Sequence, residues 1–346
     1  MKRCSVAGAD DTAAPILQKN MTGGHRIAVL DDFQNVSQQF GDWAGLQSIA
    51  KVTVFNDHLV DEDALVQRLL PFDVLCVMRD RTPLTHGLLH RLTQLRMIAL
   101  TGPLTPTLDI EAAKSLGITV CGTASSLTAQ AELTWALILA SMRHLPEEVT
   151  SFRQGGWQVS FGSDLHGKTL GVLGLGNSGS LVARYAQAFG MRVIAWSQNM
   201  TAESASRHGA ALVSKDELFS ASDIVSIHVH LSDRTRGLVG ARELALMKRR
   251  SYLVNTSRGP IVDETALLDV LQQQRIAGAA VDVFGTEPLP AGHPFRRLPN
   301  LIGTSHIGYV TEGAYERYYG ESVENIRAWI EGEPIRTITT TVREAT

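Results

Sequence analysis

The 346-residue sequence has few cysteines, no excess of basic charge and no apolar run long enough to cross a bilayer. Its three cysteines, Cys4, Cys76 and Cys121, are far apart and form no Cys-x-x-Cys motif. Such a sparse, odd set argues against a disulfide framework and favours a reducing compartment, so we expect a cytoplasmic protein. Cys121 lies near a predicted strand end, where a buried thiol is favoured over a nucleophile.

Lys and Arg number 32 against 35 Asp and Glu, which gives a net charge of −3. No basic block stands out, so the chain lacks the electrostatic footprint of a nucleic-acid-binding protein. The longest apolar run, near Leu133–Met142, is interrupted by polar residues and is too short for a membrane span. No cluster of His, Cys and carboxylate residues has the spacing of a metal site. We therefore expect no nucleic acid, membrane or metal partner.

The first 24 residues are small and polar and lack the apolar core of a secretory signal, so we expect a disordered extension over residues 1–24. The remaining length is sufficient for two domains with their own cores. Short apolar runs alternate with helical patterns along it, which predicts βαβ units on parallel sheets and an α/β fold.

The expected strands are short apolar runs bounded by polar or glycine residues. In the first part of the chain they are Arg26–Leu30, Lys51–Phe55, Phe72–Met78, Met97–Thr101 and Ile118–Cys121. In the second part they are Leu170–Leu175, Arg192–Trp196, Ala211–Val213, Ile224–His228, Tyr252–Asn255, Gly278–Asp282 and Leu301–Gly303. The expected helices are Asp61–Leu70, His86–Leu95, Ile110–Leu116, Ala129–Arg143, Ser180–Phe189 and Glu312–Gly332.

The most informative motif is Gly174-x-Gly176-x-x-Gly179, which follows an apolar strand and precedes a helical pattern. In a dinucleotide site the first glycine permits the tight turn, the second lets backbone N–H groups approach a pyrophosphate, and the third allows close helix packing. The phosphates then lie at the helix N-terminus. A plain structural turn is the alternative, and the second strand at Arg192–Trp196 favours the dinucleotide site.

Three strand ends carry polar residues suited to catalysis, and ligands of such sheets bind beyond the carboxyl ends of strands. Arg258 follows one strand within Asn255–Gly259, and an arginine can bind a carboxylate with its planar fork. Glu287 follows the next strand, and His306 follows the third. A carboxylate can orient an imidazole and favour its charged form. Taken singly, Arg258 is explained equally well as a surface residue, and His306 is explained better as a packed or exposed side chain.

Together these motifs resemble those of the D-isomer-specific 2-hydroxyacid dehydrogenase family, in its phosphoglycerate dehydrogenase-like branch. The order is Gly-x-Gly-x-x-Gly, Asn-Thr-Ser-Arg-Gly, Asp-Val-Phe-x-x-Glu-Pro and Ser-His-Ile-Gly. Arg79-Asp80-Arg81-Thr82 is similar to the family's substrate loop, and Thr101-Gly102 to its next strand end. The resemblance covers nearly the whole chain from about residue 26.

The resemblance implies a two-domain α/β fold in which each domain is a parallel sheet flanked by helices. A flavodoxin-like substrate domain would comprise residues 25–125 and 306–335, and a Rossmann nucleotide-binding domain residues 126–305. It also implies a homodimer, formed through the nucleotide domain and an arm around Leu145–Phe161.

The activity implied is that of an NAD(P)-dependent dehydrogenase, which transfers a hydride between a nicotinamide coenzyme and a D-2-hydroxy acid or its 2-keto acid. Arg258 would bind the substrate carboxylate and polarise the keto group. His306 would be the acid/base, and Glu287 would orient it and stabilise its charged form. Further substrate contacts are implied at Met78, Arg79, Asp80 and Gly102.

The coenzyme contacts implied by the resemblance come from the glycine turn and from the ends of the later strands. They are Gly174, Gly176, Asn177, Ser178, Gly179, Ser197, Gln198, Val229, Thr235, Thr256, Arg258, Asp282, His306 and Gly308. Asp282 would face the nicotinamide carboxamide.

The sequence departs from the family pattern after Trp196, where NAD enzymes usually have an acidic residue that binds the ribose 2′-hydroxyl. Here the residues are Ser197-Gln198-Asn199. The missing carboxylate no longer repels the 2′-phosphate of NADP, yet no arginine follows to bind it. We expect NAD, with NADP possible. Ser178 also departs from the pattern, because the family usually has an aliphatic residue there.

The substrate stays open, with 3-phosphoglycerate and glyoxylate or hydroxypyruvate as candidates. Arg79 or Arg81 could meet a phosphate, and solvated surface arginines fit the sequence equally well. Formate dehydrogenases resemble this family but lack the carboxylate partner of the histidine, so Glu287 argues against that activity. A nucleotide-sensing scaffold protein of the same fold would keep every motif and is the alternative from a different class.

Overall fold

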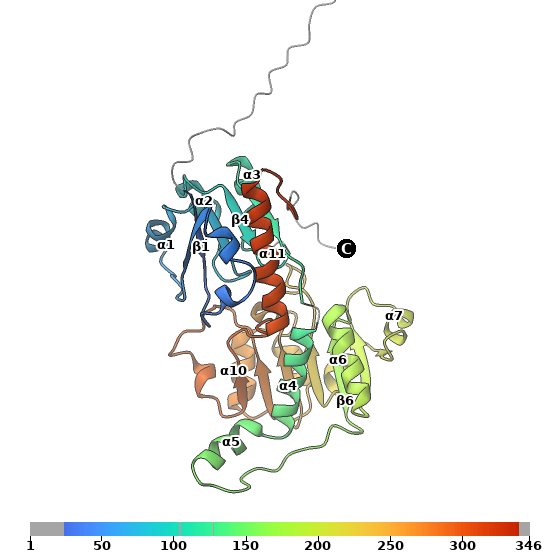
Figure 1. The fold of residues 1–346 in the computed structure, drawn as a ribbon. Coiled ribbons are helices and arrows are strands. Elements are labelled where there is room, and N and C mark those ends of the chain that lie inside the picture. Colours follow the sequence, from blue (N-terminus) through green and yellow to red (C-terminus); the bar gives the residue numbers. More distant parts are fainter. Residues whose placement is uncertain (1–23, 104, 127, 339–346) are drawn as a thin grey trace, which may run out of the picture. The chain divides into compact units, whose positions relative to one another are not determined.

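The computed structural model describes residues 24–338 except 104 and 127, and it divides into two compact units (Figure 1). Among the described residues the first unit takes 24–100, 105–122 and 322–338, and the second takes 101–103 and 123–321. The expected return to the first domain at residue 306 differs from this division, because residues 306–321 group with the second unit. The expectation of disorder over residues 1–24 lies, Gly24 apart, outside the described residues.

The first unit contains a sheet of five parallel strands in the order β2-β1-β3-β4-β5, which is the flavodoxin-like order. Its strands are β1 (His25–Val29), β2 (Ala50–Val54), β3 (Val74–Val77), β4 (Met97–Leu100) and β5 (Thr119–Gly122). Its helices are α1 (Glu62–Leu69), α2 (His86–Arg91) and α3 (Ile110–Ser115), with 3-10 turns at Ser37–Gln39 and Ala44–Leu46.

Capping residues define where these helices begin. The side chains of Asp61, Thr85 and Asp109 each accept a hydrogen bond from a backbone N–H in the first turn of α1, α2 and α3. Alternate strand residues such as Leu75 and Ile98 then bury against the apolar faces of these helices.

The last part of α11 (Glu312–Ile330) also belongs to the first unit from Ser322 onward (Figure 1). Val323 and Ile326 are buried there, and Asn325 donates to the Gly122 carbonyl at the end of β5 (3.0 Å). This helix therefore joins the first unit through both apolar packing and a buried hydrogen bond.

The second unit contains seven parallel strands in the order β12-β11-β10-β9-β6-β7-β8. They are β6 (Thr169–Leu173), β7 (Arg192–Trp196), β8 (Ala211–Leu212), β9 (Ile224–Ile227), β10 (Tyr252–Asn255), β11 (Gly278–Val281) and β12 (Leu301–Gly303). This is the doubly wound Rossmann order with one further strand at the β12 edge. The strand order reverses between β6 and β9, which pair directly, and ligands of such sheets bind at that point.

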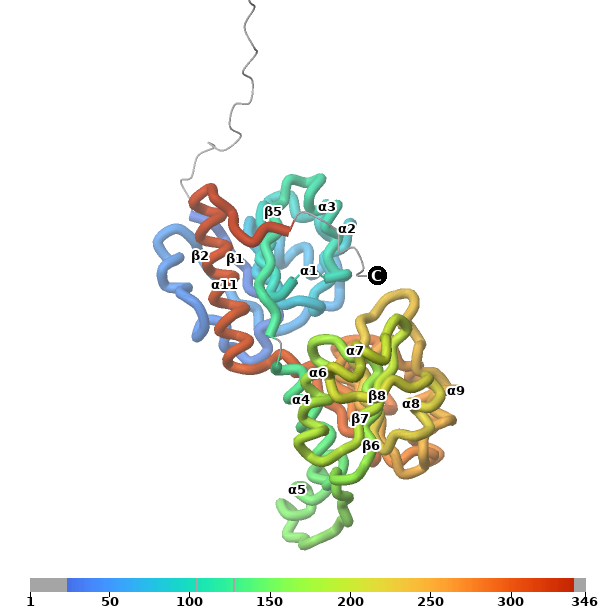
Figure 2. The backbone as a smooth tube through the Cα atoms, turned by 90° about the vertical axis from the view of Figure 1, so that its right-hand side faces the viewer, coloured from blue at the N-terminus to red at the C-terminus, as the bar shows by residue number. Residues whose placement is uncertain are grey.

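Most helices of the second unit pack against its sheet in two sets. The full set is α4 (Ala129–Met142), α5 (Leu145–Arg153), α6 (Asn177–Ala188), α7 (Ala202–Ser206), α8 (Lys215–Ala221), α9 (Ala241–Leu246) and α10 (Glu264–Gln272), with 3-10 turns at Gly259–Ile261 and Pro294–Arg297. One core joins α4 and α6 to the sheet, and another joins α8, α9 and α10 to it. Figure 2 shows α6 beside β6 and β7.

The predicted fold class is confirmed, and each of the expected strands is present, three of them with the predicted bounds: Arg192–Trp196, Tyr252–Asn255 and Leu301–Gly303. The helix expected at Ser180–Phe189 begins earlier, at Asn177, because the glycine turn itself forms its first residues. The helices α5, α7, α8, α9 and α10 were not predicted. Each has only five to nine residues, so its apolar periodicity is weak.

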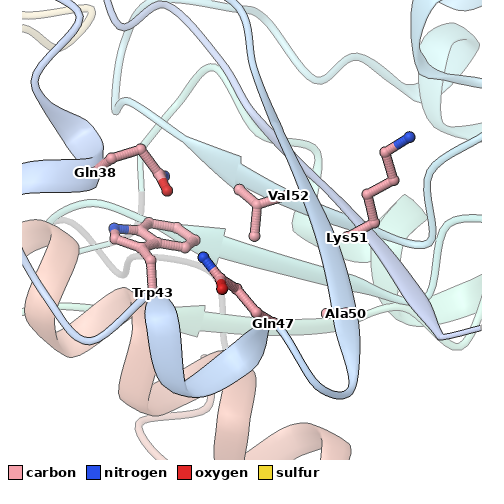
Figure 3. Close-up of a pocket in the computed structure, with 6 residues that line it drawn as sticks. All are labelled: Gln38, Trp43, Gln47, Ala50, Lys51 and Val52. Atoms are coloured by element: carbon pink, nitrogen blue, oxygen red, sulfur yellow. The ribbon is translucent and has the colours of Figure 1, made fainter.

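No helix among the described residues is both long and apolar enough to span a membrane. A surface hollow of about 330 Å³ lies against the edge strand β2 in the first unit and is lined by Gln38, Trp43, Gln47, Ala50, Lys51 and Val52 (Figure 3). In Figure 3, Gln38 and Gln47 reach toward the Trp43 ring, whereas Lys51 points away from it. None of the predicted site residues lines this hollow.

Candidate functional site

The glycine turn after β6 has the geometry that a nucleotide site requires. Gly174 has a φ of 94°, and a Cβ there would lie 2.7 Å from Cγ1 of Val229. A Cβ on Gly179 would overlap the Gly174 carbonyl oxygen, so this glycine lets α6 pack against the turn. Both positions therefore require glycine, one for backbone conformation and the other for close approach.

Gly176 differs from its neighbours because nothing lies within 4 Å of the position where its Cβ would be. It is the N-cap of α6, and no side chain caps this helix end. The first turn of α6 also contains no acidic residue. The open space, the helix dipole and the N–H groups of the first turn together suit the pyrophosphate of a dinucleotide.

A row of polar side chains lies beneath this turn. Ser178 and His228 are in contact, with Oγ 3.3 Å from Nδ1, and Nε2 of His228 lies 2.8 Å from Oγ of Ser226. Burial lowers the pKa of His228 from its ordinary 6.5 to about 4, so the ring is neutral at physiological pH. The departure at Ser178 thus replaces an apolar contact by a polar contact with a neutral histidine.

The end of β7 carries no carboxylate over residues 197–199. Lys215 lies over the ring of Trp196, with its Nζ 6.0 Å from the ring centroid. Lys215 also pairs with Glu243 at 2.8 Å. Residues 197–199 themselves therefore provide neither a carboxylate that would repel a 2′-phosphate nor an arginine that would bind it.

The predicted histidine–carboxylate pair is present. Nδ1 of His306 donates to Oε2 of Glu287 (2.6 Å), and both side chains are largely buried. The other oxygen of Glu287 accepts from the Phe284 N–H (2.9 Å). The carboxylate thus fixes the orientation of the ring through Nδ1.

Asp282 shapes the chain around His306, which has a left-handed φ of 54°. Its Oδ1 accepts from the Thr304 hydroxyl (2.6 Å) and from the Ile307 N–H (2.8 Å), and Oδ2 accepts from the Gly308 N–H (2.9 Å). Asp282 has no exposed surface. Its oxygens thus hold the loop that carries His306, and the nicotinamide contact of Asp282 stays a prediction.

The turn that carries Arg258 is held from within. Asn255 at the end of β10 accepts from the Ser257 N–H and donates to the Arg258 carbonyl, both at 3.0 Å. A Cβ on Gly259 would overlap the backbone of Phe284, so this turn packs directly on the one that leads to Glu287. The guanidinium of Arg258 donates to the Ser257 carbonyl (2.7 Å).

Helix α4 supports this turn through two residues that the sequence did not single out. Gln130 donates to the Thr256 carbonyl, and the hydroxyls of Thr134 and Thr256 lie 2.7 Å apart. The only available signal was their position in a long, mostly apolar helix, where polar residues need partners.

Among the other expected coenzyme residues, Thr235 is engaged within its own loop after β9. Its hydroxyl donates to the His230 carbonyl (2.6 Å) and accepts from the Ser232 N–H (2.8 Å). Asn177 begins α6, and Ser197 and Gln198 follow β7.

The residues expected to bind substrate fall in different units. Met78, Arg79 and Asp80 follow β3 in the first unit, whereas Arg258, Glu287 and His306 belong to the second. Gly102 groups with the second unit. Its N–H donates to the Thr123 hydroxyl (2.6 Å) and its carbonyl accepts from the Thr123 N–H (3.0 Å), so the polar groups of Gly102 are engaged within the protein.

The second unit therefore has the features of a nucleotide-dependent oxidoreductase: a doubly wound sheet, an open glycine turn at a helix N-terminus, and an imidazole–carboxylate pair beyond the strand ends. The family model described as "D-isomer specific 2-hydroxyacid dehydrogenase, NAD binding domain" matches residues 135–308. The chain belongs to this family, and its second unit contains the NAD-binding domain.

Among its relatives, the D-3-phosphoglycerate dehydrogenase of Methanocaldococcus jannaschii is 36% identical over 83% of this chain and 55% of that protein. The glyoxylate reductase of Aeropyrum pernix is 41% identical over 71% of this chain and 76% of that protein. The crystal structure of a phosphoglycerate oxidoreductase from Vibrio cholerae O395 has a TM-score of 0.86 and 39% identity, over 89% of this chain and 99% of that one. The chain thus spans about half the length of the M. jannaschii protein.

Replacing Gly176 by valine should block coenzyme binding without unfolding the protein, because the side chain would fill the open space above α6. We expect the dissociation constant of NADH to rise by at least about tenfold, measured by fluorescence titration. Gly174→Ala provides the contrast, since strain and a clash with Val229 should lower thermal stability there. Unchanged NADH affinity in Gly176→Val would contradict the assignment of this turn.

His228 should make the folded state lose stability in acid. The unfolded chain takes up a proton near pH 6.5, but the folded chain does so only near pH 4, so stability falls as the pH drops through that window. The loss relative to His228→Gln should be at most about 3 kcal/mol. Urea unfolding of both proteins at several pH values measures it, and identical pH profiles would refute a buried, neutral His228.

Proposed function

We propose that the protein interconverts a D-2-hydroxy acid and its 2-keto acid with a nicotinamide coenzyme. The observation that carries this proposal is the His306–Glu287 pair, which lies beyond the carboxyl ends of strands in a sheet that also carries the nucleotide turn. The largely buried carboxylate orients an imidazole, a group that can serve as proton donor and acceptor in catalysis.

His306 is the proposed acid/base. During reduction Nε2 gives its proton to the keto oxygen, and during oxidation Nε2 takes the proton of the hydroxyl. Glu287 holds the ring by Nδ1 and stabilises the imidazolium, because the charged pair is largely buried. The hydride itself is exchanged by the nicotinamide when the coenzyme is bound.

Arg258 is the proposed carboxylate-binding residue. A guanidinium matches a carboxylate through two parallel hydrogen bonds, and its charge also polarises a neighbouring keto group. The Asn255 and Gly259 contacts hold its backbone, which fixes where the side chain starts. We also propose that the loop of Met78, Arg79 and Asp80 binds the substrate.

We propose small 2-keto acids as substrates, with glyoxylate, hydroxypyruvate and the 3-phosphoglycerate couple as candidates. The names of the relatives support this range, since they include a glyoxylate reductase and a D-3-phosphoglycerate dehydrogenase. NAD(H) is the proposed coenzyme. NADP(H) is also accepted in this proposal, because residues 197–199 contain no carboxylate to repel the 2′-phosphate.

The function is tested by following NADH and NADPH oxidation with glyoxylate, hydroxypyruvate, pyruvate and 3-phosphohydroxypyruvate. We expect turnover with at least one keto acid and a D-configured product, identified by chiral chromatography. Tight NADH binding without turnover of any keto acid would reject the dehydrogenase and favour a nucleotide-sensing scaffold.

Substitutions at the pair should lower turnover much more than coenzyme affinity. His306→Asn should reduce kcat by about 100-fold or more, because the proton donor is lost. Glu287→Gln should also lower kcat and shift its pH profile to lower pH, since the imidazolium loses its charged partner. Arg258→Lys should raise KM and lower kcat.

Glu264→Gln is the matched control for Glu287→Gln. Its carboxylate accepts from the Gly285 N–H (2.7 Å) in the same turn, and the structure shows no contact between Glu264 and His306 among its described hydrogen bonds. The control should keep the wild-type pH profile. Equal pH shifts in both variants would contradict the role of Glu287.

We also propose that the chain forms a homodimer through the arm around Leu145–Phe161. Large apolar side chains are exposed there, with Phe152 at 69%, Trp157 at 77% and Phe161 at 94%. A surface of this kind is typical of a protein–protein interface.

Charged substitutions in the arm should therefore separate the subunits. We expect Trp157→Glu combined with Phe161→Glu to convert a dimer into a monomer in size-exclusion chromatography with light scattering. Val60→Glu, at a position exposed by 85% in the first unit, is the control and should leave the mass unchanged. A monomeric wild-type protein would refute the dimer.

A further inference from the structure

A second buried histidine–carboxylate cluster lies in the first unit. Asp31 follows β1, and its Oδ1 accepts from Nδ1 of His58 (2.8 Å) while Oδ2 accepts from the Thr82 hydroxyl (2.7 Å). The side chains of His58 and Asp31 are only 10% and 2% exposed. Each carboxylate oxygen thus has one strong donor in a site with little access to water.

The three side chains lie in the segments that follow three neighbouring strands. The sheet order is β2-β1-β3, so Asp31 lies between the segment after β2, which carries His58, and the segment after β3, which carries Thr82. Thr82 and Asp31 are 51 positions apart in the sequence. The carboxylate therefore ties the segment after β3 to the segments after β1 and β2.

The segment after β3 is the loop from Met78 to Thr82. Asp80 within it has a left-handed φ of 64° and accepts from the Thr105 hydroxyl, while the Arg81 N–H donates to the Met78 carbonyl (3.3 Å). Asp31 is itself left-handed, with a φ of 58°. Such backbone conformations are uncommon for non-glycine residues, aspartate being among those that adopt them most readily, and the hydrogen bonds of the cluster stabilise them here.

We propose that Asp31, oriented by His58, is a positioning residue that holds the substrate loop in its binding conformation through the Thr82 hydroxyl. The proposal rests on the proposed function, in which this loop binds the keto acid. Neither Asp31 nor Thr82 is proposed to contact the substrate. Their effect is to fix the backbone of residues 78–81, so their loss weakens substrate binding more than it slows the chemical step.

A second histidine–aspartate pair in the first unit lies at the amino ends of the strands and serves as a comparison for the Asp31 cluster. His25 at the start of β1 contacts Asp73 just before β3, and Asp73 also accepts from the Arg26 N–H (2.6 Å). This pair joins the same two strands, β1 and β3, but it lies at their amino ends, away from the loop. Loss of this pair should therefore affect the stability of the sheet without affecting the loop of residues 78–82.

The central variant is Thr82→Val, which keeps the side-chain size and removes the donor. We expect KM for glyoxylate or hydroxypyruvate, whichever the wild-type protein reduces, to rise by about tenfold. The value of kcat and the NADH dissociation constant should change less than about twofold. Thr82→Ser restores the hydroxyl and should return KM to near the wild-type value.

His25→Asn is the matched control and should lower thermal stability while leaving KM unchanged. Hydrogen–deuterium exchange provides a readout that needs no activity. Amides in a peptide covering residues 78–84 should exchange faster in Thr82→Val than in the wild type or in Thr82→Ser, whereas His25→Asn should leave that peptide unchanged.

The outcomes separate this proposal from the proposed function. If the wild-type protein reduces no keto acid, the proposed function fails, and faster exchange in Thr82→Val still supports the role of Asp31 in holding the loop. Unchanged exchange in Thr82→Val overturns the proposal. Faster exchange with an unchanged KM overturns the link between the loop and substrate binding. Equal increases of KM in Thr82→Val and His25→Asn would show that the cluster only stabilises the fold.

Discussion

Asp282 has no exposed surface, and its carboxylate accepts hydrogen bonds from Thr304, Ile307 and Gly308. These bonds hold the chain on both sides of His306, whose left-handed backbone would otherwise be unfavourable. The His306–Glu287 pair depends on this arrangement, because Nδ1 can reach the carboxylate only if the histidine backbone is fixed. The position of the imidazole thus depends on a buried carboxylate that accepts three hydrogen bonds.

The first unit also contains a buried carboxylate that holds a loop through hydrogen bonds. Asp31 follows β1 as Asp282 follows β11, and each buried carboxylate binds groups from a loop at the carboxyl edge of its sheet. Parallel strands end at a common edge, so one acidic side chain there can reach segments that are remote in sequence. Carboxylates suit this task because they accept several hydrogen bonds and the charge strengthens each one.

Much of the fold was predictable because its strands are short apolar runs between polar turns, as at Tyr252–Asn255. The nucleotide turn was equally readable, since Gly174 and Gly179 meet steric demands that only glycine satisfies. The hydrogen bonds that Asp282 accepts from residues 304–308 were not predicted. The position of Asp282 after a strand is apparent in the sequence, but the direction of its side chain depends on where residues 304–308 pass, which local patterns do not encode.

The amino-acid sequence by itself determined the alternation of strands and helices, the glycine turn and the position of Arg258, Glu287 and His306 after strand ends. These depend on periodicity and local sterics. Only the tertiary structure decided that Asp31 meets His58 and Thr82. Hydrogen bonds between residues so far apart require a particular strand order, and many orders are compatible with the same hydrophobic pattern.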